Sequence, residues 1–147
     1  MHAKLLFFLV LNFLFFHSSC QTKRYTPSDF TGDMIIFGSG GGFAGTVTEY
    51  CLLENGQLFL KKPGESSFAP LDDIDINLAR QTFQNYKTLD LASIKLRVPG
   101  NMYYFVRKGT KDKMHEITWG AHDASPPDKV KTYYSHLNNL VNPQVNQ

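Results

Sequence analysis

The stretch "DMIIFGSGGGFAGTVTEYCLLENGQLFLKK", residues 33–62, contains three β-like runs separated by two glycine-containing segments. Residues 33–37 are short, apolar and β-branched, which is typical of a strand. Residues 46–53 and 57–62 are joined at Asn55-Gly56, a dipeptide that tolerates the positive φ angles of a type I′ hairpin turn. The stretch therefore predicts three strands, with the last two paired as an antiparallel hairpin.

The first glycine segment resembles nucleotide-binding motifs only in its spacing. Gly40, Gly42 and Gly45 satisfy G-x-G-x-x-G, and Val47 extends the pattern to that of a kinase glycine-rich loop. The dinucleotide motif needs a helix after the glycines, whereas "TVTEYCLL" is β-like. A kinase would also need its strand lysine, catalytic loop and D-F-G, which this sequence does not contain. We therefore expect no nucleotide and no cofactor.

The same segment is the candidate binding loop. Glycines between strands permit positive φ and a close approach of backbones, and Phe43 in their midst needs an apolar environment. We expect Phe43 to point inward, because most large aromatic side chains are buried; pointing outward, it could anchor in a partner's cleft. Ser39 lacks the G-x-S-x-G context of a nucleophile and is expected in a turn. The candidate loop comprises Ser39, Gly40, Gly41, Gly42, Phe43, Ala44 and Gly45.

Two helices and a second strand pair follow. Residues 75–88 have helical apolar spacing, and Asp72, Asp73 and Asp75 lie at the positive end of the helix dipole. Residues 101–108 and 113–119 predict strands around a turn, and residues 89–98 are ambiguous. The last helix is predicted to begin with Ser125 as its N-cap and Pro126 at its first position, and to end before Pro143.

The predicted order is β-β-β-α-β-β-α. Adjacent hairpins require antiparallel pairing, so the fold class is α+β, with an antiparallel sheet of about five strands and two helices packed on one face. Tyr103, Tyr104, Phe105, Tyr133 and Tyr134 lie in amphipathic elements, where we expect them to pack in the core with some hydroxyls reaching solvent.

The N-terminus predicts export. Residues 1–19 have one cation, a 12-residue apolar run and then small residues, which is typical of a signal peptide and too short for the roughly 20 residues of a membrane span. "HSSC" resembles a bacterial lipobox, which implies lipidation of Cys20. The alternative is ordinary secretion, with a possible disulfide between Cys20 and Cys51. Residues 20–32 would then form a tether, 33–142 a single domain and 143–147 a tail.

The net charge and the spacing of the histidines argue against nucleic-acid binding and metal binding. Removing Lys4 with the signal leaves 14 cations (15 minus 1) against 13 acids, so nucleic acid is not an expected partner. The basic run at residues 107–113 is expected to be a solvated hairpin tip. His115, His122 and His136 lack the spacing of metal ligands, and we expect no metal. An enzyme would need His115, His122 and Asp123 to converge in space. We therefore expect a binding module with no catalytic residues.

The order of elements adds a resemblance. A strand ending in "GGFAG", residues 41–45, followed by "QTFQNYKTLDL", "YYFV", "HEITW" and "PPDKVKTYYSHLNNL", is similar to emfourin-type proteins over residues 34–140. These are small bacterial inhibitors of protealysin, a thermolysin-like zinc metalloprotease. This resemblance implies a protein that inhibits such a protease by occluding its cleft. The lipobox resemblance, with Gln21 after the cysteine, implies a lipid anchor in the bacterial envelope, with the outer membrane favoured. The alternative is a structural or small-ligand-binding envelope lipoprotein without inhibitory activity, for which a tyrosine-lined pocket would be the sign.

Overall fold

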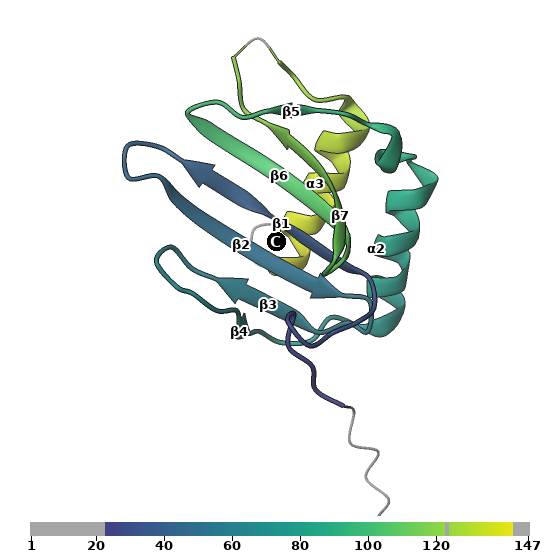
Figure 1. Cartoon of the computed structure of the whole chain (residues 1–147). Coiled ribbons are helices and arrows are strands. Elements are labelled where there is room, and N and C mark those ends of the chain that lie inside the picture. The colour runs from purple at the N-terminus through teal and green to yellow at the C-terminus, as the bar shows by residue number, and fades with distance from the viewer. Residues whose placement is uncertain (1–22, 123, 143–147) are drawn as a thin grey trace, which may run out of the picture.

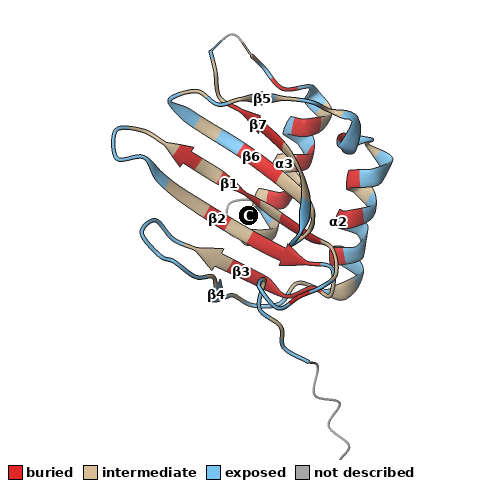
Figure 2. Ribbon diagram, viewed as in Figure 1, coloured by how far each residue is buried: buried red, intermediate tan, exposed pale blue. Residues whose placement is uncertain are grey.

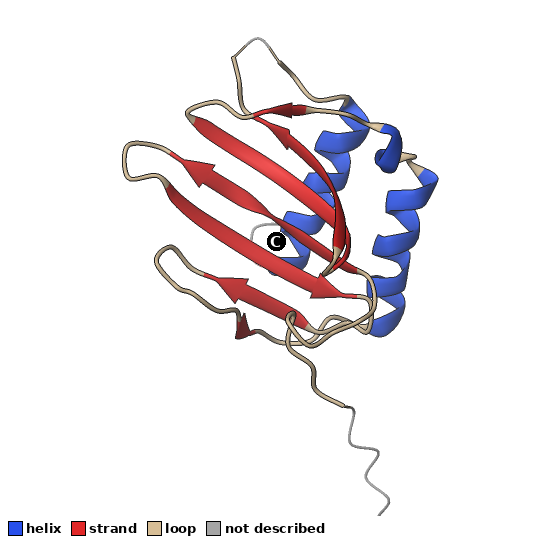
Figure 3. Ribbon diagram, in the orientation of Figure 1, coloured by secondary structure: helices blue, strands red, loops and turns tan. Residues whose placement is uncertain are grey.

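The computed structural model describes residues 23–122 and 124–142 and has an α+β fold. One mixed sheet has seven strands in the order β4-β3-β2-β1-β6-β7-β5 (Figures 1 and 3). The elements along the chain are β1 (Met34–Gly41), β2 (Thr46–Leu53), β3 (Leu58–Lys61), β4 (Ala69–Pro70), α2 (Ile76–Thr88), the 3-10 helix η2 (Leu91–Ser93), β5 (Arg97–Val98), β6 (Met102–Thr110), β7 (Lys113–Trp119) and α3 (Asp128–Val141).

The sheet is larger than predicted, and it is not wholly antiparallel. The five longer strands pair antiparallel, with β1 in the centre between β2 and β6. The two additional strands, β4 and β5, have only two residues each, too few for an alternating pattern to be recognised in the sequence. β5 pairs parallel with β7, whereas β4 pairs antiparallel with β3. These very short strands, one containing Pro70, lie at the two edges of the sheet, and each pairs with only two residues of its neighbour.

The β2–β3 hairpin is confirmed, but its turn differs from the prediction. Gly56 has φ +91°, whereas Asn55 is not among the residues with positive φ. The Gly56 N–H donates to the Leu53 carbonyl (3.0 Å), and the Leu53 N–H donates to the Gln57 carbonyl (2.9 Å). This is a three-residue loop that ends in a left-handed glycine, and such a loop needs positive φ at one residue where type I′ needs it at two.

The first helix is confirmed and the second begins later than predicted. Asp75 caps α2, and its carboxylate accepts hydrogen bonds from the backbone N–H groups of Asn77 (3.0 Å) and Leu78 (3.1 Å). The N-cap of α3 is Pro127, with no side-chain cap, and Ser125 and Pro126 precede the helix. The residue before a proline is disfavoured in the α region, so Pro126 cannot open a helix when Pro127 follows it.

The main core lies between the helices and one face of the sheet. Buried side chains of the longer strands form one apolar cluster with buried residues of α2 and α3. Figure 2 shows buried positions in red on the strands and on both helices. The fully or nearly fully buried residues of this layer include Ile35, Phe37, Leu52, Val106, Ile117, Ala79, Tyr86, Tyr133 and Leu137. The hydroxyl of Tyr133 donates to the Thr82 carbonyl (3.1 Å), and that of Tyr134 donates to the Gly38 carbonyl (3.0 Å). Both helices are thus fixed on the same face.

The opposite face is covered at one end by the segment that precedes β1. Phe30 is buried in a second apolar cluster with Met34, Cys51, Leu53 and Phe59, and Tyr25 packs against this cluster. The buried amide of Gln57 holds the chain further upstream, because it accepts from the Tyr25 N–H (3.0 Å) and donates to the Lys23 carbonyl (3.3 Å). Part of the expected tether, residues 20–32, is therefore docked on the domain from residue 23 onward.

The rest of this face carries a row of alternating charges across five strands. Glu49 on β2 pairs with Lys61 on β3 and with Arg107 on β6 (2.9 Å). Glu116 on β7 pairs with Arg107 (3.3 Å) and with Arg97 on β5 (3.0 Å). A charged row of this kind keeps the uncovered face polar. In the described part of the chain, no helix is long and apolar enough to cross a bilayer.

Candidate functional site

The candidate loop is divided between a strand and a turn. Ser39, Gly40 and Gly41 are residues of β1, and only the last four positions, residues 42–45, form the turn between β1 and β2. The expectation of Ser39 in a turn is therefore wrong. Residues 39–41 pair with both β2 and β6, and a strand paired on both sides leaves no freedom to bend.

Inside β1, the glycines leave room for aromatic rings of the neighbouring strand. A Cβ on Gly38 would collide with the Thr48 carbonyl oxygen and would lie 3.2 Å from Phe105 Cζ. A Cβ on Gly40 would lie 2.7 Å from Tyr103 Oη and 2.8 Å from Tyr103 Cζ. The rings of Phe105 and Tyr103 on β6 thus lie over β1 at Gly38 and Gly40, where β1 has no side chains. These glycines are needed for packing.

The turn that follows is held by two backbone hydrogen bonds. The Gly45 N–H donates to the Gly42 carbonyl (3.0 Å), and the Gly42 N–H donates to the Asn101 carbonyl just before β6 (2.8 Å). Gly41, Gly42 and Gly45 have φ values of +108°, +75° and +58°, in the region that favours glycine. The second hydrogen bond ties the turn to the neighbouring strand, so its backbone is defined without any side-chain contribution.

Phe43, at the tip of this turn, points outward. Its relative exposure is 111%, so the expectation of an inward side chain is wrong. The turn lies beyond the ends of the paired strands, and its other residues, Gly42, Ala44 and Gly45, provide almost no apolar surface for a ring. The alternative, an outward aromatic residue beside exposed backbone, is the one that the structure has.

Two further apolar side chains are exposed at the same end of the sheet. Met102 (52% exposed) pairs with Gly41, and a Cβ on Gly42 would lie 3.3 Å from its Sδ. Tyr104 (41% exposed) follows on the same face of β6 and is fixed against Trp119 and Tyr134, with ring centroids 5.8 and 5.6 Å away. We call Phe43, Met102 and Tyr104 the tip surface. They are three of the four exposed large hydrophobic residues in the described part of the chain, and Leu78 on α2 is the fourth.

A hollow lies beside the β1–β2 turn on the uncovered face of the sheet, the face opposite to Met102 and Tyr104. Its volume is about 550 Å³, and it lies between the β1–β2 turn and the loop after β3. Tyr103, Glu49 and Arg107 are among its lining residues. The turn is therefore bordered by Met102 and Tyr104 on one face of the sheet and by a charged recess on the other.

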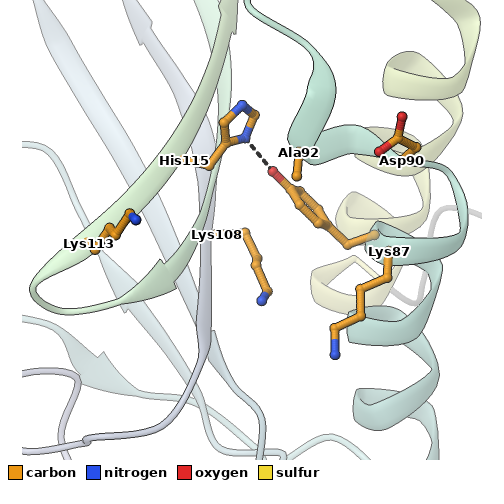
Figure 4. Close-up of a pocket in the computed structure, with 7 residues that line it drawn as sticks. Lys87, Asp90, Ala92, Lys108, Lys113 and His115 are labelled. Carbon is orange, nitrogen blue, oxygen red and sulfur yellow. Dashed lines mark hydrogen bonds between the residues drawn. The ribbon is translucent and has the colours of Figure 1, made fainter.

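Two of the three candidate histidines, His115 and His136, are held by hydrogen bonds in separate places. His115 Nε2 lies 2.9 Å from the Ile94 carbonyl, which can only accept, so Nε2 carries the proton. Nδ1 then accepts from the Tyr86 hydroxyl at 2.6 Å (Figure 4). His136 Nε2 bonds Thr82 Oγ1 (2.9 Å) on α2, and burial lowers the pKa of His136. His122 lies in the loop after β7, and Asp123 lies outside the described residues.

The remaining candidate residues either contact structural partners or lie outside the residues that the structure describes. Cys20 precedes the first described residue. Cys51 is fully buried, and burial together with the nearby charge of Glu49 raises its thiol pKa to about 12, so it packs as a small hydrophobic residue. Asp73 pairs with Arg24 (2.8 Å). Across residues 23–122 and 124–142, no group of three or more His, Cys, Asp or Glu side chains is placed to hold a metal ion.

Comparison with models of known protein families and with characterised proteins finds no match to this chain. The site must therefore be interpreted from its own residues. Sequence analysis did not identify Met102 and Tyr104 as parts of it. Strand alternation places both on the face with Val106, but the sequence does not reveal that the helices leave this end of the sheet uncovered.

Proposed function

We propose that this chain is a non-catalytic protein-binding module of the bacterial envelope that contacts its partner through the tip surface. The observation that carries the proposal is the complete exposure of Phe43 on a turn fixed by backbone hydrogen bonds. Aromatic residues that enter a partner's pocket are frequent anchors of protein interfaces. The neighbouring Met102 and Tyr104 extend the apolar area around the anchor.

The shape of the tip favours a cleft as the partner's surface. Phe43 is flanked by glycine and alanine, so the tip is one side chain wide and can enter a narrow opening. Burying an exposed Phe side chain contributes about 1.5–3 kcal/mol. Because the backbone of the turn is already ordered, little conformational entropy is lost on binding.

The resemblance to emfourin-type proteins supplies the class of partner. The motif that carries the resemblance, residues 41–45, includes the exposed turn. We therefore propose a thermolysin-like metalloprotease whose active-site cleft is occluded by the turn, with no covalent step. Lipidation of Cys20 would anchor the module in the envelope, with the outer membrane favoured and secretion as the alternative.

The test compares Phe43→Ala with the parent chain as an inhibitor of a thermolysin-like protease. Both chains begin at residue 20 and carry Cys20→Ser, so that no lipid interferes. We expect the parent to inhibit, and Phe43→Ala to weaken inhibition about 30-fold or more, as loss of an aromatic anchor does. Leu78→Ala, which removes the exposed hydrophobic residue on α2, is the matched control and should inhibit like the parent.

Two outcomes separate the parts of the proposal. If the protease kept full activity at high excess of the parent chain, the proposed inhibitory role would be wrong. A photo-crosslinking residue placed at position 43 of the lipidated chain in cells would still test for a partner, with position 78 as control. Equal crosslinking at both positions would overturn the tip surface as the contact site.

A second function, small-ligand binding, is favoured by a different observation. A cavity of about 420 Å³ lies beside Tyr86 and His115, between α2 and the β6–β7 hairpin. Sites for small ligands commonly have volumes of roughly 300–1,000 Å³.

A further inference from the structure

The cavity beside Tyr86 brings three lysines together from three elements. Lys87 lies in the last turn of α2, Lys108 on β6 and Lys113 at the start of β7, and all three line the cavity (Figure 4). In the sequence, Lys108 and Lys113 belong to the basic run expected to be a solvated hairpin tip. The fold places them opposite a helix that contributes a third ammonium group.

The charges around the cavity are unbalanced. Asp90 is the one carboxylate among the lining residues, so three cations minus one anion leave a net charge of +2. Lys108 pairs with Asp33, which lies outside the lining, and counting this second carboxylate reduces the net charge around the cavity from +2 to +1. Lys87 and Lys113 have no carboxylate within ion-pair distance among the described residues. Like charges gathered at one site repel each other, and a bound anion would relieve that repulsion.

The back wall of the cavity is fixed by two hydrogen bonds. Tyr86 donates to His115 Nδ1 (2.6 Å), and His115 Nε2 donates to the Ile94 carbonyl (2.9 Å). Burial raises the pKa of Tyr86 to about 12, so its hydroxyl adds no negative charge at ordinary pH. The tyrosine hydroxyl thus does not offset the charge of the lysines.

We propose that this cavity binds a small phosphate-bearing anion. Lysine ammonium groups are frequent phosphate ligands and bind phosphate oxygens as point charges, whereas arginine binds both phosphates and carboxylates through its planar fork. The lining has three lysines and no arginine. The site is independent of the tip surface, because the β6–β7 hairpin and the Gly42–Gly45 turn lie at opposite ends of the sheet (Figure 1).

The experiment titrates the Cys20→Ser chain, beginning at residue 20, with inorganic pyrophosphate at low ionic strength, followed by amide NMR shifts and calorimetry. Sodium chloride at matched ionic strength is the reference. We expect saturable shifts around residues 86–92 and 108–115. Lys87→Ala and Lys113→Ala should each weaken binding about three- to tenfold. Lys131→Ala, which removes an exposed lysine on α3, should leave it unchanged.

Vesicles of phosphatidylglycerol, with phosphatidylcholine vesicles as reference, distinguish the source of the phosphate. Binding of pyrophosphate with weak vesicle binding would indicate a free phosphate compound. Binding of phosphatidylglycerol vesicles alone, reduced by Lys87→Ala and Lys113→Ala, would indicate a lipid headgroup. The proposal is overturned if neither binds, or if Lys131→Ala weakens binding as much as the cavity variants do. None of these outcomes depends on Phe43, so the proposed function is tested separately.

Discussion

In the first half of the glycine-rich stretch, Gly38 and Gly40 lie inside β1 beneath aromatic rings, whereas in the second half Gly42 and Gly45 form a turn that exposes Phe43. The composition is the same, but the physical reason for glycine differs. In the strand, glycine is needed because there is no room for a Cβ. In the turn, glycine is needed because the backbone has positive φ. One half stabilises the fold, and the other half presents a side chain to solvent.

The largest expected effect is that of Gly38→Ala. The new Cβ would meet the backbone carbonyl of Thr48, which cannot move without disturbing the β1–β2 pairing. We expect the free energy of unfolding to fall by about 3 kcal/mol or more. Chemical denaturation measures it, and Gly40→Ala is the graded control, because its clash is with the Tyr103 side chain, which can rotate away. Equal losses at the two positions would contradict the role of packing.

Phe43→Ala should weaken partner binding while leaving stability almost unchanged, in contrast to Gly38→Ala. Because the ring is fully exposed, we expect stability to change by less than about 0.5 kcal/mol, while partner binding weakens as described above. Thermal unfolding and binding should be measured on the same preparation. A clear loss of stability would mean that the ring packs on the domain in solution, and it would remove the distinction between the two halves.

Gly45→Ala tests backbone conformation alone. A Cβ at Gly45 meets no atom within 4 Å, so only its φ of +58° opposes a side chain. We expect a loss of about 1–2 kcal/mol. Gly45→Asn should lose less, because asparagine adopts the left-handed region more readily. Equal losses of unfolding free energy for Gly45→Ala and Gly45→Asn would mean that the backbone conformation is not the reason for glycine at position 45.

The smallest expected effect is a pH dependence of stability that arises from Glu116, near the strand glycines Gly38 and Gly40. The Phe105 ring that covers Gly38 is itself covered by the Arg107 guanidinium, 4.4 Å from the ring centroid, which Glu116 helps to hold. Partial burial raises the pKa of Glu116, but the Thr118 hydrogen bond and the charges of Arg107 and Arg97 outweigh it, and the pKa lies below its usual value.

The sign of the pH effect follows from that direction. A carboxylate whose pKa is lower in the folded state stabilises the fold above its unfolded pKa, about 4.3 for Glu, and this stability is lost as pH falls through the folded pKa. We expect the parent to lose up to about 1 kcal/mol more than Glu116→Gln below pH 4.5. Urea unfolding at pH 7 and pH 3.5 measures the difference. Parallel pH profiles for the two chains would contradict this role of Glu116.

Much of the fold could be predicted from periodicity and turn residues, and the errors have local causes. The long strands and α2 have enough residues for alternation or helical spacing to be recognised. The two-residue edge strands do not, and the start of α3 depends on the effect of Pro127 on Pro126. Each error concerns a constraint that acts over one or two residues.

The candidate site was less predictable than the fold, because it depends on which parts of the sheet the helices and loops leave exposed. Phe43 was located by its motif, but burial statistics favoured the wrong orientation for it. Lys87 is separated from Lys108 by 20 residues, and no spacing rule brings them to one cavity. Exposure and convergence are properties of the assembled sheet and helices, and a single sequence does not encode them in a recognisable pattern.

The hydrogen bonds of Gln57 to Lys23 and Tyr25 would limit how far the domain can move from a lipid on Cys20, if Cys20 carries one as proposed. Lys23 is held at the β2–β3 end of the sheet, and Phe43 lies past the other end of β2, whose eight residues span about 27 Å. A trans chain reaches at most about 3.6 Å per residue, so a lipid on Cys20 would keep this docked end within roughly 11 Å of the bilayer surface. The aromatic tip lies at the opposite end of β2 from this attachment point, so anchoring there would leave the tip free to reach a partner.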